Sequence, residues 1–233
     1  MMFFYDYWYI FVVLIPSMLI SGGASMLVRS AFKKYSQVES MRHISGAEAA
    51  KMMLDKAGIY DVEIVTTQGM LSDHYNPTNK TLALSPQVYG STSVAAIGVA
   101  CHEAGHALQH AHGYTPMWIR SMLVPAANLG TSMGYIVMAL GVFLNSPITI
   151  IIGCALFSLI LLFQLVTLPV EFDASARAKR LVVEQGILYP EEKVGVDRVL
   201  NAAALTYVGA AITSLLTLLY YLSRAGVFGG SDD

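Results

Sequence analysis

The sequence predicts a mainly α-helical membrane protein with about four transmembrane helices and a small α+β portion outside the membrane. Of the 233 residues, 55% are hydrophobic and only 13% are charged, about half the charged fraction of an ordinary soluble domain. Four apolar runs are long enough to cross a hydrocarbon core about 30 Å thick. Two polar segments, about 29–116 and 171–201, lie between these runs. We expect one integral membrane domain over residues 1–233.

The first apolar run is expected to remain in the protein as an anchor. The four expected spans lie at about residues 8–28, 117–144, 148–170 and 202–222. No basic residue precedes the first span, and Arg29 follows it directly. Because a secretory signal peptide carries its positive charges in front of the apolar stretch, an uncleaved anchor fits better. The small residues at 21–24 leave cleavage open as the alternative.

The distribution of cations predicts the orientation. Alternate flanks of four spans lie on the same side of the membrane. One side receives 29–116, 171–201 and Arg120, which together hold all the Lys and Arg residues except Arg224. Flanks rich in Lys and Arg stay on the cytoplasmic side. We therefore expect the polar segments in the cytoplasm and both termini outside.

Capping residues predict two helices in the first polar segment. Residues 45–48 fit a capping box, which favours a helix to about residue 57, and Gly58 is a typical residue just past a helix end. Ser91 or Thr92 can cap the second helix, which we expect to end near His112.

Two short strands are expected between these helices. Residues 62–67 alternate, and 81–84 form a second strand candidate. The stretch 73–79 is rich in turn-forming residues. It contains His74 and Tyr75, which could hydrogen-bond a developing oxyanion or could belong to a plain surface turn.

The second helix carries the most informative pattern, His102-Glu103-Ala104-Gly105-His106. Two histidines four residues apart on a helix face the same way, so both can bind one zinc ion. Glu103 can reach a metal-bound water and accept its proton, and this spacing suits peptide hydrolysis. The alternative is a pair of packed histidines without metal.

Neighbouring residues on this helix have weaker interpretations. His110 faces the same way as His106, but one zinc ion does not normally reach three successive turns, so His110 is expected behind the ligands or facing solvent. Cys101 is expected to pack. Cys101 and Cys154 lie far apart in the chain, and no disulfide is expected between them.

A catalytic zinc site needs a third protein ligand and an open position for water. The candidate is Glu171, which follows the third span and is expected on the same side as the two histidines. Asp173 is the substitute candidate. In a competing interpretation, Glu171 and Asp173 only cap the start of a helix, where acidic residues are favourable.

Three segments together resemble a known family, the YugP-like neutral zinc metallopeptidases of bacteria. These segments are Ser72 to Pro77, Ser93 to Gln109 and Leu168 to Ser175. The resemblance covers nearly the whole chain, and the family is similar to the membrane-bound gluzincins. It implies a zincin-like catalytic portion at the cytoplasmic face of the bacterial plasma membrane, with one Zn²⁺ ion. Carried over by position, the ligands are His102, His106 and Glu171, and Glu103 is catalytic.

One position departs from the better-known membrane gluzincins, which place an aspartate four residues after the ligand glutamate. Here that position is Ser175, and Asp173 lies about 200° away around a helix. Support for a ligand histidine would then come from the Ser175 hydroxyl, or the local backbone would not be helical.

Composition and charge limit the other functions. The net charge of −2 gives no basic surface for nucleic acid. A metal transporter or sensor without hydrolysis is the alternative function, but the spans carry almost no ionisable residues, which ion pathways usually need. We expect the bilayer and a protein or peptide substrate as partners. The sequence does not specify the substrate or the oligomeric state.

Overall fold

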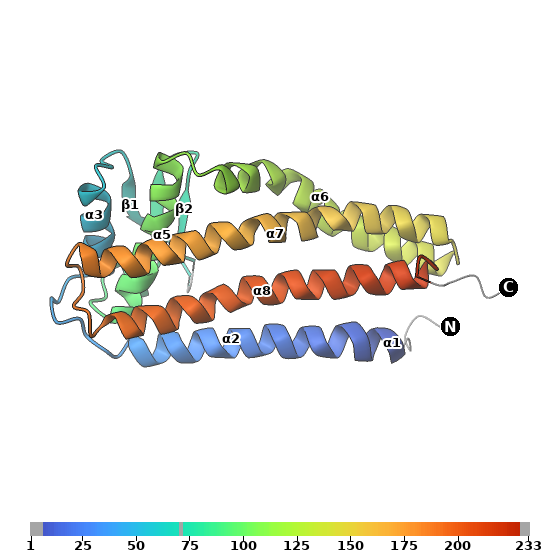
Figure 1. Cartoon of the computed structure of the whole chain (residues 1–233), viewed down its shortest axis with the longest axis horizontal. Helices are drawn as coiled ribbons and strands as arrows, with labels where there is room; N and C mark the ends of the chain where they lie inside the picture. Colours follow the sequence, from blue (N-terminus) through green and yellow to red (C-terminus); the bar gives the residue numbers. More distant parts are fainter. Residues whose placement is uncertain (1–6, 70–71, 229–233) are drawn as a thin grey trace. The chain divides into compact units, whose positions relative to one another are not determined.

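The computed structural model describes residues 7–69 and 72–228, which are mainly helical (Figure 1). The helices are α1 (Tyr7–Tyr9), the π-helical turn η1 (Ile10–Leu14), α2 (Ile15–Tyr35), α3 (Gly46–Lys56), α4 (Pro86–Tyr89), α5 (Val94–Ala111), α6 (Thr115–Phe143), α7 (Pro147–Glu184) and α8 (Lys193–Arg224). The strands are β1 (Glu63–Thr66), β2 (His74–Asn76) and β3 (Thr81–Leu84).

Four helical segments are long and apolar enough to cross a membrane, as the sequence predicts. They are Tyr7–Tyr35, Thr115–Phe143, Pro147–Glu184 and Lys193–Arg224. The first, third and fourth extend beyond both ends of the apolar runs that predict them, and the second begins two residues before its run and ends one residue before the run does. The fold is therefore a mainly helical one with four candidate spans and a small three-stranded sheet.

The chain divides into two compact units. The first, here called the span unit, comprises 1–24, 119–168 and 206–233. The second, here called the site unit, comprises 25–118 and 169–205. Because α2, α6, α7 and α8 each have residues in both units, every candidate span continues into the site unit along the chain.

The sequence-based alternative that Glu171 and Asp173 cap the start of a helix is wrong. Both residues lie inside the continuous helix α7. Pro169 precedes them within the helix and lacks the N–H that would continue the backbone hydrogen-bond pattern. The Thr167 hydroxyl, two residues before the proline, donates to the carbonyl of Phe163 within the same helix.

In the span unit, α6 and α7 pack closely through glycines. A Cβ on Gly134 would lie 2.9 Å from the Phe157 backbone, and a Cβ on Gly153 would lie 2.5 Å from the Met138 nitrogen. Met138 and Phe157 belong to a buried apolar cluster that also contains Cys154, a free cysteine. Close approach at small residues is the usual way in which helices associate in a bilayer.

In the site unit, α3 and α5 begin with capping residues. Ser45 and Glu48 form the predicted capping box, and Gly58 adopts a φ of +73° beyond the helix end. The cap of α5 is Ser93, not Ser91 or Thr92, since the Ser93 hydroxyl accepts from the Ala96 N–H. Residues 91 and 92 cannot begin the helix because their carbonyls are used elsewhere. The Ser91 carbonyl accepts from the Gly46 N–H, and the Thr92 carbonyl accepts from the Ser40 N–H.

The sheet has the order β1-β3-β2, with β1 parallel and β2 antiparallel to β3. The sequence predicts β1 and β3, and β3 has the predicted bounds. It does not predict β2, which forms in the stretch expected to be a turn. Pairing with β3, which joins His74 to Ala83 and Asn76 to Thr81, outweighs the local turn preference, and the turn follows at residues 77–80.

Candidate metal centre

Helix α5 provides two of the three candidate ligands and is buried along most of its length. Its buried side chains are mostly small, including Ala96, Ala100 and Ala104, which are fully buried. Small side chains allow neighbouring elements to approach the helix axis closely. Helix α3, the sheet and the site-unit part of α7 pack with α5 in one hydrophobic core.

Helix α7 provides the third candidate ligand at a close contact with α5. A Cβ on Gly105 would lie 2.7 Å from the Ala174 carbonyl oxygen, so only glycine fits there without a shift of the backbone. Gly105 lies directly before His106, and Glu171 lies three residues before Ala174. This contact therefore places the Glu171 carboxylate opposite the two imidazoles.

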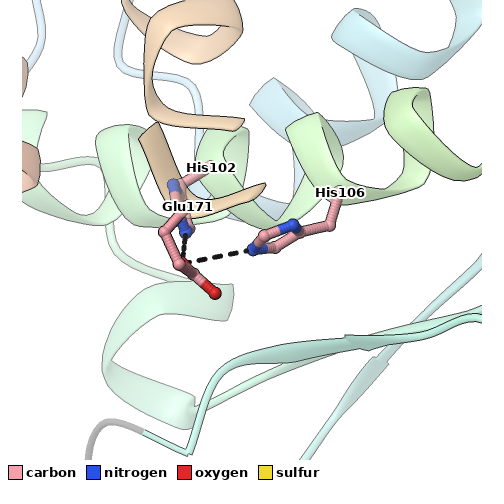
Figure 2. A group of neighbouring side chains, drawn as sticks. All are labelled: His102, His106 and Glu171. Carbon is pink, nitrogen blue, oxygen red and sulfur yellow. Dashed lines mark ion pairs between the residues drawn. The ribbon is translucent and has the colours of Figure 1, made fainter. Parts of the chain in front are cut away.

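The side chains of His102, His106 and Glu171 converge on one point (Figure 2). One potential ligand atom from each residue lies within 4.8 Å of the other two. Glu171 Oε2 is 3.3 Å from His102 Nε2 and 3.6 Å from His106 Nε2. Glu171 and His106 are buried, and His102 is partly buried. The structure thus brings together the three residues that the sequence singles out as ligands.

A hydrogen-bond chain behind His106 fixes which nitrogen faces this point. The Gln109 amide nitrogen donates to the Val170 carbonyl and to Asp173 Oδ2, both at 2.8 Å. Its carbonyl oxygen therefore faces His106 Nδ1 at 2.9 Å. Because that oxygen can only accept, Nδ1 carries a proton, and in the neutral imidazole Nε2 then has the lone pair. Nε2 is the nitrogen that faces Glu171.

The chain continues from Asp173 to the end of α5. Arg177 Nε donates to Asp173 Oδ2 at 2.6 Å, and Arg177 Nη1 lies 3.4 Å from His112 Nδ1. The guanidinium also lies over the Tyr114 ring, 5.9 Å from its centroid. Asp173 therefore sits between Gln109 and a cation, while its carboxylate takes no part in the group of three candidate ligands.

Ser175 occupies the corresponding position behind His102. Its hydroxyl oxygen lies 3.1 Å from His102 Nδ1. A hydroxyl can donate or accept, so this contact orients the ring without selecting its tautomer. Of the two sources of support that the sequence leaves open, the structure shows the Ser175 contact on a helical backbone.

The three residues fit a zinc ion. Two ligand atoms at about 2.0–2.1 Å from a tetrahedral ion lie roughly 3.4 Å apart, which is close to the observed separations of 3.3 and 3.6 Å. Two imidazoles and one carboxylate are a common protein set for catalytic zinc. The hydrogen bond at His106 Nδ1 leaves its other nitrogen available for the metal.

The electrostatics of the site also favour a cation. Burial by itself lowers the pKa of the His106 imidazole. The neighbouring Glu171 carboxylate and the negative charge of Glu103 outweigh burial and raise that pKa above its ordinary value. Negative charges that favour an imidazolium favour a bound metal ion in the same way.

Glu103 lies next to the ligands on α5 and is buried, with 8% of its surface exposed. Its charge contributes to the field at His106. Among the described residues, no hydrogen bond or ion pair engages its carboxylate. The side chain is thus not committed to a structural partner.

The remaining sequence candidates lie outside the group of three. Tyr75 donates or accepts a 2.8 Å hydrogen bond with His110 Nδ1, and burial together with the Asp61 charge raises its pKa to about 12. His74 is exposed, and its Nδ1 lies 2.8 Å from the Ser72 carbonyl. Cys101 is fully buried, which raises the pKa of its thiol and agrees with a packing role.

Sequence reasoning missed Gln109 and Arg177. Gln109 is fully buried and joins His106 to α7. Its spacing of three residues from His106 places it on the same helical face, and this spacing was the available signal. Arg177 follows Asp173 by four residues, the spacing of an intrahelical ion pair.

Comparisons with known proteins agree with this geometry. Residues 10–226 match the family described as "Putative neutral zinc metallopeptidase". The chain is also 44% identical, over 208 residues, to the "Putative membrane protease YugP" of Bacillus subtilis (strain 168). The aligned region covers 89% of this chain and 92% of that relative. No solved structure matches the chain significantly.

Proposed function

The chain belongs to the neutral zinc metallopeptidase family, and on this premise we propose that it is a membrane metalloendopeptidase. Its substrates are peptide bonds of membrane or misfolded proteins, cleaved at the cytoplasmic face. The observation that carries the proposal is the group His102, His106 and Glu171, partly or fully buried, whose ligand atoms lie within 4.8 Å of one another. We propose that residues 1–233 act as one membrane domain in this reaction.

In this proposal His102, His106 and Glu171 hold one Zn²⁺ ion. When bound, zinc supplies a Lewis acid that polarises the substrate carbonyl and makes a water more acidic. Gln109 holds the His106 ring with Nε2 toward the Glu171 carboxylate, and Ser175 orients the His102 ring. Both contacts reduce the reorganisation that ligation would otherwise require.

Glu103 is the general base of the proposed reaction. Its carboxylate takes a proton from the attacking water and later gives it to the leaving amine. Two features support this role: its position between two candidate ligands in the sequence, and a carboxylate that forms no hydrogen bond or ion pair with the described residues. A base with no structural partner can change its protonation state without breaking a structural contact.

The proposed function is tested by Glu103→Gln. The amide keeps the shape of the side chain but cannot accept a proton, so we expect wild-type zinc content and a loss of peptidase activity of about 100-fold or more. Zinc is measured by mass spectrometry of the purified protein, and cleavage with casein and a membrane peptide. A transporter or sensor would show no such split, and normal turnover by the variant would exclude Glu103 as the base.

We also propose that the site unit faces the cytoplasm and that both termini lie outside, as the cation distribution indicates. A cysteine introduced at Thr78, between β2 and β3, is then protected from an impermeant reagent in intact cells. A cysteine at Asn145, between α6 and α7, reacts. Cys101 and Cys154 are buried and give little background. The opposite labelling pattern would place the site outside.

A further inference from the structure

A groove separate from the metal centre lies between α2 and α8 within the site unit. Its volume is about 660 Å³, within the range of ordinary ligand sites. None of the three candidate zinc ligands lines it. Three residues from each helix define its length: Leu27, Ala31 and Lys34 on α2, and Arg198, Ala202 and Leu205 on α8.

The groove has a charged end and an apolar end. The C-terminal end of α2 lies against the N-terminal end of α8, since a Cβ on Gly195 would lie 2.8 Å from the Tyr35 ring. Lys34 and Arg198 therefore both lie toward this end. Leu27 and Leu205 lie about two turns further along their helices, toward the apolar sequences that form candidate spans.

The charged end carries excess positive charge. Asp197 also lines the groove, but its carboxylate pairs with Lys193 Nζ at 2.7 Å. Within residues 7–69 and 72–228, neither Lys34 nor Arg198 forms an ion pair. Both side chains are exposed and can turn toward an anion in the groove. Charge complementarity therefore points to a negatively charged ligand group.

We propose that this groove binds an anionic phospholipid. The phosphate contacts Lys34 and Arg198, and an acyl chain lies along Leu27, Ala202 and Leu205. Basic pockets beside transmembrane helices are a known way to bind anionic headgroups. The apolar end requires a ligand with a hydrocarbon tail, which a free phosphate ion lacks. The proposal does not depend on the peptidase reaction.

The expected affinity change follows from the two cations. One Lys or Arg near a membrane surface changes the affinity for anionic lipid by about fivefold. Loss of both cations should therefore weaken binding roughly 20- to 30-fold. Phosphatidylcholine, which has no net charge, should bind more weakly than phosphatidylglycerol by a similar factor.

The test uses the full chain, purified in a neutral detergent and titrated with phosphatidylglycerol or phosphatidylcholine in native mass spectrometry. The variant Lys34→Gln/Arg198→Gln removes the groove cations. The matched control, Arg29→Gln/Lys33→Gln, removes two cations from the same end of α2 that do not line the groove. We expect the 20- to 30-fold loss only in the first variant, with the zinc content unchanged in both.

A second variant, Ala31→Trp, fills the groove and keeps both cations. It should also lose phosphatidylglycerol binding, and its thermal unfolding midpoint establishes that it is folded. Equal weakening by the two charge variants would overturn the proposal, because it would indicate attraction to any basic surface. Equal binding of both lipids, or displacement of the lipid by millimolar inorganic phosphate, would overturn it as well.

Discussion

Helix α7 packs differently in the two units of the molecule. In the span unit, its contact with α6 is apolar, and the nearby hydroxyls bond within their own helices, as Thr131 does to Ala127 and Ser158 to Ala155. In the site unit, its contact with α5 is bridged by buried polar side chains, since Gln109 donates to Val170 and Ser175 contacts His102. At both contacts the two helices approach closely at a glycine, Gly134 in the span unit and Gly105 in the site unit.

The difference separates two tasks of helix packing. A glycine sets how closely two helices approach, and it does so in both units. Interhelical hydrogen bonds determine how the side chains at a contact are oriented. At the contact between α5 and α7 they orient the candidate zinc ligands. A close helix contact is therefore required for the metal centre but does not by itself create one.

The largest expected effect comes from widening the contact in the site unit. In Gly105→Ala the new Cβ meets the Ala174 carbonyl at 2.7 Å, so α7 must shift and take Glu171 with it. We expect the zinc affinity to fall by roughly 100-fold or more, since moving a ligand exceeds the 10- to 100-fold cost typical of changes behind the ligands. Zinc titration against a competing chelator measures it.

Gly134→Ala is the matched control in the span unit, where the new Cβ meets the Phe157 backbone at 2.9 Å. Overpacking should cost about 1–3 kcal/mol of stability and lower the thermal unfolding midpoint, with the zinc affinity changed less than about threefold. If both substitutions removed zinc equally, the proposed division between the two contacts would be wrong.

A smaller effect is expected from a variant that keeps the distance between α5 and α7 and loses only the hydrogen bonds that orient the His106 ring. Gln109→Leu preserves volume but removes the acceptor for His106 Nδ1 and the donor to Val170. We expect a 10- to 100-fold lower zinc affinity. His110→Leu, one residue further on α5, is the control and should retain zinc, because His110 bonds Tyr75. A normal affinity in Gln109→Leu would show that the close contact alone orients the ligand.

Local patterns in the sequence predict the parts of the site that depend on one element. The spacing of His102 and His106 follows from the helix period, and β3 follows from its own residues. Strand β2 depends on its partner β3 elsewhere in the chain, so no local pattern shows it. The spacing of Gln109 from His106 indicates a shared helical face, but the hydrogen bond from Gln109 to Val170 on α7 required the structure. The place of Glu171 after the third span and the family resemblance both indicated this ligand, whereas the Gly105–Ala174 contact that positions it required the structure.

The central claim, that His102, His106 and Glu171 form the zinc centre, is tested most directly on α7 itself. Glu171 and Asp173 are two residues apart, and both are carboxylates. The two single alanine variants are titrated with zinc against a competing chelator at one fixed pH, because ligation competes with protonation. We expect Glu171→Ala to lose more than roughly 100-fold in affinity and Asp173→Ala to keep its zinc with a smaller loss. Loss of zinc in Asp173→Ala with normal binding in Glu171→Ala would contradict the assignment.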